Sequence, residues 1–314
     1  MRAAVRVALD FYGPEDPAGL AEGVRRALAA DPDLRVVLAG TPSDVAAAFD
    51  SIDVPDRVEV RTAAPIPAET PEPARAIRGL RPASVRVATG LVRDGQADAA
   101  VLLGAPSVAL AATEFVLPLL PGVTRPAVAA MIRQSVLLDV SGNPDVKDGG
   151  ASSLALLGLG LAATFGRREA GVAPLAASEQ RGEGSVAQLT AAVLRPLAEA
   201  GFFRVEQAVD LREVVTNVSL PPVVVTDGFS GSVLRDALDV GTERCVRTPS
   251  GGGVVLGIEG VVVVGRADSA RACADAIACA AEVYRGGLVD RTRRLMGDLV
   301  AWRRSYAGLN PVLP

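Results

Sequence analysis

Hydrophobic positions along the chain form short continuous runs that alternate with longer stretches in which apolar residues recur every three or four positions. The short runs predict strands of a parallel sheet, because such strands are buried on both faces and are apolar throughout. We expect strands at residues 5–9, 35–39, 58–61, 99–103, 128–132, 136–140, 172–175, 223–226 and 261–264. We expect helices at residues 18–30, 44–49, 84–94, 107–117, 152–165, 185–200, 269–285 and 288–306, and one that starts at Ser230.

The alternation of these elements predicts a single α/β domain over residues 1–314, with three α/β/α layers around a mostly parallel, Rossmann-like sheet. We expect loops at residues 64–82, which are rich in proline and polar side chains, and at residues 141–151. Ligands of such sheets bind beyond the carboxyl ends of the strands. Because Asp10, Gly104, Asp139 and Asp227 stand at or just after predicted strand ends, we expect the chemistry near them.

Composition removes several classes of function. The net charge of -4 and the scattered arginines leave no basic stripe for nucleic acid. The chain has no histidine, which excludes a Ser-His-Asp triad and histidine-bound zinc, and its only lysine, Lys147, lies outside any P-loop motif. The chemistry that remains works by positioning and electrostatics, such as direct transfer of an activated group.

The sequence also predicts where the protein works. Its three cysteines, Cys245, Cys273 and Cys279, show no metal-ligand spacing, which favours a reducing compartment. The first ten residues are too short and too soon interrupted by charge for a signal peptide, and no apolar run reaches the roughly 20 residues of a membrane span. We expect a cytoplasmic protein.

Four blocks of sequence carry a family resemblance. Residues 81–126 contain Ser84-Val85-Arg86, a Gly-x-Ala-Asp-Ala turn and a Leu-Pro-Gly-x-x-Arg-Pro segment. Residues 138–158 read LDVSGNPDVKDGGASSLALLG, and residues 223–233 read VVVTDGFSGSV. Residues 252–277 form a glycine-rich strand entry, a strand and a helix. In order and spacing these blocks resemble the bacterial acyl-ACP:phosphate acyltransferases, which open phospholipid synthesis.

The resemblance implies a fold like that of isocitrate and isopropylmalate dehydrogenases. It also implies a reaction in which a fatty acyl group moves from acyl carrier protein to phosphate without metal or cofactor. The partners would be acyl carrier protein and phosphate, or another small-molecule acceptor. In the family a helical excursion serves pairing and membrane contact, and between Val240 and Gly251 this chain is much shorter. Homodimerisation and peripheral membrane contact are therefore left open.

The resemblance assigns site residues. The catalytic candidates are Lys147, Glu183 and Ser232. The substrate-binding candidates are Asp10, Ser84, Arg86, Gly104, Ser107, Asp139, Asn143, Asp145, Asp227, Gly228, Ser230, Gly231 and Arg266. A plainer alternative exists for several of them: aspartates at strand ends brace turns, Ser84 caps a helix, and Arg86 is a surface charge.

Several family positions are changed in this chain. The family's opening Asp-Ala-Met-Gly-Gly-Asp becomes Asp-Phe-Tyr-Gly-Pro-Glu at residues 10–15, and its Gly-Asn-Thr-Gly loop becomes Gly-Ala-Pro-Ser at residues 104–107. A family lysine is Glu183, a family asparagine is Ser232, and a family histidine falls at Arg266.

Three hypotheses follow from these changes. In the first, the chain is an acyltransferase whose acceptor is phosphate, or a neutral or cationic molecule for which Glu183 is the general base. In the second, it is a catalytically degenerate relative that binds acyl carrier protein or an acyl group as a partner subunit. In the third, it is an unrelated layered α/β binding protein.

Overall fold

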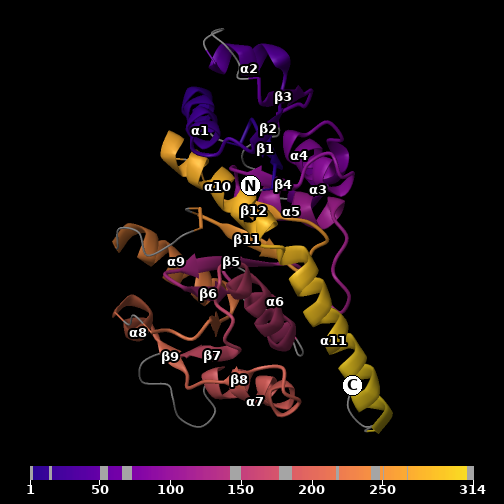
Figure 1. Cartoon of the computed structure of the whole chain (residues 1–314), viewed down its shortest axis with the longest axis vertical. Coiled ribbons are helices and arrows are strands. Elements are labelled where there is room, and N and C mark those ends of the chain that lie inside the picture. Colours follow the sequence, from indigo (N-terminus) through magenta and orange to yellow (C-terminus); the bar gives the residue numbers. More distant parts are fainter. Residues whose placement is uncertain are drawn as a thin grey trace. The chain divides into compact units, whose positions relative to one another are not determined.

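In the computed structural model the chain folds into two compact units, each built from two separate stretches of sequence (Figure 1). Unit 1 comprises Met1–Pro118 and Val246–Gly286, and unit 2 comprises Leu119–Cys245 and Gly287–Pro314. The structure describes residues 3–13, 16–49, 56–65, 73–141, 150–176, 186–216, 219–241, 248–249, 251–266 and 268–309. The expected single domain stays a prediction, because compactness alone does not decide whether the units fold separately.

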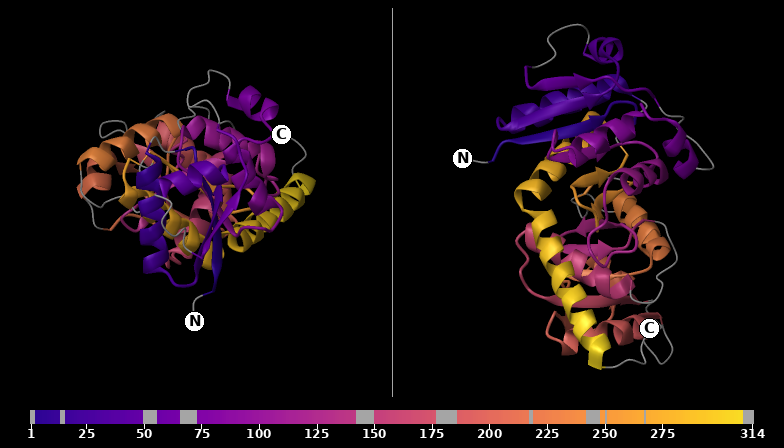
Figure 2. Two further views of the ribbon diagram at one scale, coloured as in Figure 1. Left: turned by 90° about the horizontal axis from the view of Figure 1, so that it is seen from above. Right: turned by 90° about the vertical axis from the view of Figure 1, so that its right-hand side faces the viewer.

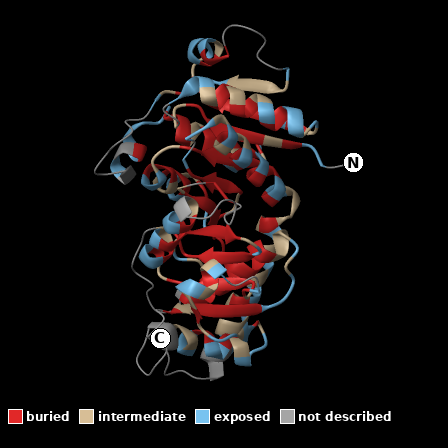
Figure 3. Ribbon diagram, turned by 90° about the vertical axis from the view of Figure 1, so that its left-hand side faces the viewer, coloured by how far each residue is buried: buried red, intermediate tan, exposed pale blue. Residues whose placement is uncertain are grey.

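Unit 1 is built on a mostly parallel run of strands. In spatial order they are β3 (Val58–Arg61), β2 (Leu34–Ala39), β1 (Val5–Asp10), β4 (Ala99–Leu102), β12 (Val262–Val264) and β11 (Gly253–Leu256). Each neighbouring pair from β3 to β12 is parallel, and β11 is antiparallel to β12. The strands between the two edges are buried almost throughout, which explains their continuous apolar sequences (Figure 3).

Helices cover both faces of this sheet. They are α1 (Pro17–Ala30), α2 (Pro42–Ala48), α3 (Pro73–Gly79), α4 (Ser84–Arg93), α5 (Pro106–Val116) and α10 (Ala270–Arg285). The pair α1 and α10 packs on one side of the strands, and α4 with α5 on the other (Figure 1). Side chains cap the starts of α1 and α10: Asp16 accepts from the amide of Ala18, and Ser269 accepts from that of Ala272.

Unit 2 repeats this arrangement with different strands. The order is β5 (Ala127–Ile132), β6 (Ser135–Leu138), β10 (Val223–Val225), β7 (Gly171–Ala176) and β8 (Arg204–Val205), and β9 (Val209–Asp210) also pairs with β7. Strands β6, β10, β7, β8 and β9 pair in parallel, whereas β5 and β6 form an antiparallel hairpin. The expectation of a mostly parallel α/β fold is confirmed in each unit.

The helices of unit 2 are α6 (Gly150–Thr164), α7 (Val186–Glu199), α8 (Leu211–Thr216), α9 (Gly228–Gly241) and α11 (Leu288–Leu309). Helix α6 packs on β6 and β10, and α11 packs against α6. In Figure 2, α11 runs as one continuous yellow helix. Among the described residues, no helix combines the length and apolar character needed to cross a membrane.

The predicted loop over residues 64–82 is wrong in part, because α3 lies inside it. This helix starts at Pro73, and proline is favoured in the first turn because its missing amide would have no partner there. Among the side chains of α3 that the structure describes, only that of Ile77 is fully buried, which is too little for a periodic pattern to reveal. The short elements β8, β9 and α8 were also not predicted.

Candidate functional site

The carboxyl ends of the central strands of unit 1 bring several predicted residues to one edge of its sheet. Because β1, β4 and β12 are parallel neighbours, their ends meet there. Asp10 ends β1, Gly104 follows β4 after one residue, and Arg266 follows β12 after one residue. The expectation that Asp10 and Gly104 lie at strand ends is confirmed.

Asp10 is a buried carboxyl group with few partners. Its side chain is 1% exposed, and its Oδ1 accepts a hydrogen bond from the amide of Tyr12 at 3.1 Å. Burial raises the pKa of Asp10 to about 6, and the Ser84 hydroxyl and the Tyr12 amide oppose that rise. This carboxyl therefore changes its protonation state close to neutral pH.

Ser84 does not cap α4, contrary to the prediction. The cap position is occupied by Ala83, whose side chain makes no capping bond, and Ser84 is the first residue of the helix. The Ser84 hydroxyl is fully buried and lowers the pKa of Asp10, yet it has no hydrogen-bond partner of regular geometry among the described residues. Sequence alone could not distinguish this buried hydroxyl from an ordinary cap.

A close approach of two backbone segments fixes the turn after β1. A Cβ atom on Gly13 would lie 2.7 Å from the carbonyl carbon of Leu103 and 2.9 Å from the nitrogen of Gly104, so only glycine fits there. Helix α5 starts two residues after Gly104, and the side chain of its cap residue, Ala105, makes no capping bond. Ser107 lies exposed in the first turn of α5, where the helix dipole favours an anion.

Two arginines complete the predicted set in unit 1. Arg266 is exposed and lies against Gly251, where a Cβ atom would come within 2.6 Å of its Nε. Arg86 is engaged within the unit, because its Nη1 donates to the carbonyl oxygens of Ile77 (2.7 Å) and Arg78 (3.3 Å). Its guanidinium also lies over the ring of Phe115. Arg86 therefore ties α3 to α5, and a role in binding substrate stays a prediction.

A second cluster lies at the corresponding edge of unit 2, around Asp139. This residue follows β6 directly, and its side chain is 1% exposed. Oδ1 accepts from the amides of Val128 (3.0 Å) and Ser141 (2.8 Å), and Oδ2 accepts from the Ser141 hydroxyl (2.7 Å). Burial raises the pKa of Asp139, and these hydrogen bonds, together with the charge of Arg125, oppose the rise.

Helix α9 starts beside Asp139. Asp227 caps this helix, because its Oδ1 accepts from the amide of Ser230 at 2.8 Å. A Cβ atom on Gly231 would lie only 1.9 Å from the carbonyl oxygen of Asp139, so only glycine fits at this position in the first turns of the helix. Gly228 is buried in the first turn, and Ser232 is half-buried one turn further on. The structure thus brings Asp139, Asp227 and the predicted residues of α9 together.

Arg125 also lies in this cluster, although it is not among the predicted site residues. Its Nη2 lies 4.0 Å from Oδ2 of Asp139, and its side chain is 33% exposed. The signal was available, because Arg125 is the arginine of the Leu-Pro-Gly-x-x-Arg-Pro segment. The predicted residues Asn143, Asp145, Lys147 and Glu183 lie outside the described residues.

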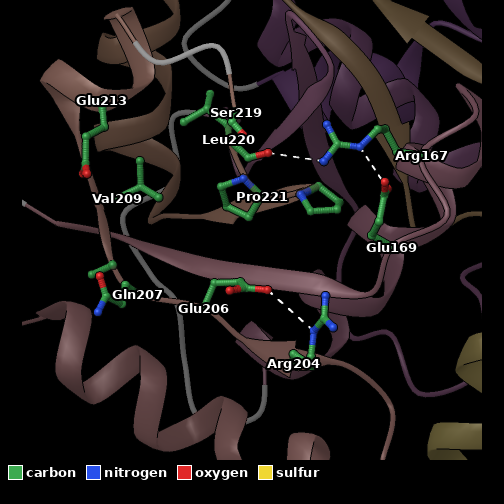
Figure 4. A pocket seen from close by; sticks show the side chains of 12 residues that line it. Arg167, Glu169, Arg204, Glu206, Gln207, Val209, Glu213, Ser219, Leu220 and Pro221 are labelled. Atoms are coloured by element: carbon green, nitrogen blue, oxygen red, sulfur yellow. Dashed lines mark hydrogen bonds and ion pairs between the residues drawn. The ribbon is translucent and has the colours of Figure 1, made fainter.

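A cleft of about 460 Å³ lies elsewhere in unit 2 (Figure 4). It is found at the amino-terminal ends of β7 and β10, where Glu169 and Pro222 precede the strands. Its charged walls pair with one another, because Arg167 contacts Glu169 at 3.0 Å and Arg204 contacts Glu206 at 3.7 Å. The cleft contains none of the predicted site residues. In the described part of the chain, no group of three acidic or cysteine side chains gathers as a metal site.

The chain is similar to a known protein family. Residues 5–248 match the family model described as "Fatty acid synthesis protein". The chain belongs to this fatty acid synthesis protein family. The matched region includes Asp10, Arg125, Asp139 and α9, so it contains residues of both clusters. The family resemblance in the sequence is confirmed.

Curated relatives in this family carry one name. A phosphate acyltransferase of Myxococcus xanthus (strain DK1622) is 29% identical over 341 residues, which cover 95% of each chain. A phosphate acyltransferase of Exiguobacterium sp. is 32% identical over 242 residues, which cover 75% of this chain and 72% of the relative.

Solved structures that are more distant in sequence share the fold. The EutD phosphotransacetylase from Staphylococcus aureus has a TM-score of 0.61 at 18% identity, covering 89% of this chain and 94% of that one. The 4-hydroxythreonine-4-phosphate dehydrogenase from Klebsiella pneumoniae has a TM-score of 0.57 at 13% identity, covering 89% of this chain and 99% of that one. These similarities confirm the α/β fold of this chain.

Proposed function

We propose that this chain transfers an acyl group from the thioester of acyl carrier protein to inorganic phosphate, and so forms an acyl phosphate. The observation that carries the proposal is the family match over residues 5–248, together with relatives named phosphate acyltransferases along most of the chain. The fold adds support, because both clusters lie at carboxyl ends of parallel strands, where such folds bind ligands.

The reaction needs no redox partner. An oxygen of hydrogen phosphate attacks the carbonyl carbon of the thioester, so that a carbon–oxygen bond forms and the carbon–sulfur bond breaks. The proton of the hydrogen phosphate ends on the departing sulfur, which leaves as the thiol of the carrier protein. The negative charge that builds on the thioester oxygen needs fixed donors, such as backbone amides in the first turn of a helix.

The proposed reaction also needs a place that binds the phosphate. Phosphate is an anion, so ionised carboxylates next to it would oppose binding. In unit 2, Arg125 lies 4.0 Å from Asp139 and carries the opposite charge.

The test is direct. Purified protein is incubated with acyl carrier protein thioesters of several chain lengths, with and without phosphate, and thiol release and acyl phosphate are followed by mass spectrometry. Phosphate-dependent release with an equal amount of acyl phosphate supports the proposal. Binding of the carrier protein without release at any chain length would instead support the degenerate partner subunit and reject the proposed reaction.

A further inference from the structure

Arg125 stands on a rigid turn at the start of unit 2. Leu120 is 1% exposed, and its carbonyl accepts from the amide of Val123 at 3.1 Å. Gly122 has φ +76°, and a Cβ atom there would lie 2.8 Å from Cγ2 of Val300 in α11. The turn therefore requires glycine and packs tightly on α11. The backbone that leads to Arg125 is fixed before any ligand arrives.

The side chain of Arg125 lies beside the Asp139 carboxylate, which hydrogen bonds hold in place. Asp139 is held by three hydrogen bonds, and its own amide donates to the carbonyl of Thr226 at 3.2 Å, which extends the pairing of β6 with β10. The 4.0 Å contact with Oδ2 gives the guanidinium an electrostatic anchor, while one third of the side chain stays open to solvent. An arginine in this setting is oriented by its carboxylate partner, and its solvent-exposed part is accessible to an anion.

The charges of this edge make that role specific. Asp139 and Asp227 are both acidic: Arg125 lies against Asp139 with the opposite charge, and Asp227 accepts from the amide of Ser230. A dianion that approached this edge without Arg125 would meet carboxylates. The start of α9 lies against the Asp139 carbonyl at Gly231, and its dipole adds to the attraction for an anion.

We infer that Arg125 binds the phosphate acceptor of the acyl transfer, and that Asp139 is the residue that positions it. The inference rests on the proposed function and adds to it a binding residue outside the predicted set. Arginine suits this task because its fork donates two parallel hydrogen bonds to a phosphate group, which lysine cannot do.

The test compares Arg125→Gln, Arg125→Lys and Arg204→Gln. Arg204 is the matched control, because it lies in the same unit, faces Glu206 at 3.7 Å and belongs to the opposite edge of the strands. Thiol release from an acyl carrier protein thioester is measured while phosphate is varied. We expect Arg125→Gln to raise the KM for phosphate about tenfold to a hundredfold. Arg125→Lys should raise it less, and Arg204→Gln should leave it unchanged.

The same experiment separates substrate binding from a structural effect. The KM for the carrier protein thioester should stay within about twofold in all three variants, because Arg125 is assigned to the acceptor alone. The double variant Arg125→Gln/Asp139→Asn should show the phosphate KM of Arg125→Gln, since a positioning residue has no further effect once its partner is lost. Equal losses for both substrates would overturn the inference and assign Arg125 to folding.

Calorimetric titration with inorganic phosphate distinguishes this inference from the proposed reaction. Wild-type binding that is lost in Arg125→Gln supports the inference even if no acyl transfer is found. Phosphate-dependent transfer with an unchanged phosphate KM in Arg125→Gln overturns the inference and leaves the reaction standing. Absence of both binding and transfer in the wild type overturns both.

Discussion

Asp10 in unit 1 and Asp139 in unit 2 are equally buried carboxyl groups with different hydrogen-bond partners. Each stands at the end of a buried parallel strand and is 1% exposed, and burial raises the pKa of both. Asp10 accepts one backbone amide, whereas Asp139 accepts two amides and a hydroxyl and has Arg125 beside it. Two equally buried carboxyls therefore differ in their partners: Asp10 has few, whereas Asp139 is held as a fixed part of the framework.

The largest expected effect separates the two by removing the carboxyl. Asp139→Leu leaves one buried donor and two half-buried donors without their acceptor. At about 1–3 kcal/mol for the buried donor and less for the other two, the free energy of unfolding should fall by about 3 kcal/mol. Asp10→Leu leaves the Tyr12 amide and the nearby Ser84 hydroxyl and also removes the cost of burying the carboxyl, so its loss should be smaller.

Urea unfolding measures this difference. Fluorescence of Trp302, the chain's single tryptophan, reports on unit 2, where its ring meets that of Phe202 edge to face. Circular dichroism reports on both units. If Asp10→Leu cost as much as Asp139→Leu, the contrast in hydrogen bonding would not decide the stability of these sites.

The second effect is a pH dependence that belongs to Asp10. Because its pKa is raised from 3.8 to about 6, the folded protein holds a proton that the unfolded chain releases. This contribution to stability is present below pH 3.8 and is lost as the pH rises through about 6. Two pKa units correspond to about 3 kcal/mol. Wild type should lose about that much more stability than Asp10→Asn between pH 4 and pH 7.

Asparagine keeps an acceptor for the Tyr12 amide, so the variant isolates the proton. Asp139 also has a raised pKa, but it is present in both proteins and its contribution cancels in the comparison. The measurement is urea unfolding of both proteins at several pH values. Parallel curves would mean that Asp10 takes up no proton on folding.

The smallest effect concerns Ser84. Ser84→Ala removes a buried hydroxyl without a regular partner, so stability should change by less than about 1 kcal/mol. The pKa of Asp10 should rise, because the Ser84 hydroxyl lowers it in the wild type. Carbon-13 NMR of the Asp10 carboxyl measures the shift. Thr89→Val is the control, since the Thr89 hydroxyl donates to the Val85 carbonyl one turn further along α4.

The fold could be predicted further than the site. The central strands of both units are buried on both faces, so their apolar runs are visible in the sequence. Strand direction is not encoded in such runs, and the antiparallel hairpin of β5 and β6 therefore went unpredicted. It depends on a tight turn in which Arg133 takes φ 56°, a conformation that the residue type does not suggest.

The site divides in the same way. Asp10, Asp139 and Asp227 could be located from the sequence, because each stands at or just after the end of a predicted strand. The partners of these residues come from distant segments: Ser84 reaches Asp10 from helix α4, and Arg125 reaches Asp139 from the loop before β5. Such pairs follow from packing in three dimensions, which local periodicity does not record.

The order in which the chain is synthesised differs from the order in which unit 1 is assembled. Strand β4 has β1 on one side and β12 on the other, yet β12 begins only at Val262. While unit 2 is being translated, β4 carries an unpaired edge, and unpaired edges are templates for pairing with other chains. Unit 1 therefore keeps this edge open until β12 has been made, and a chain truncated before Val262 should be prone to aggregate.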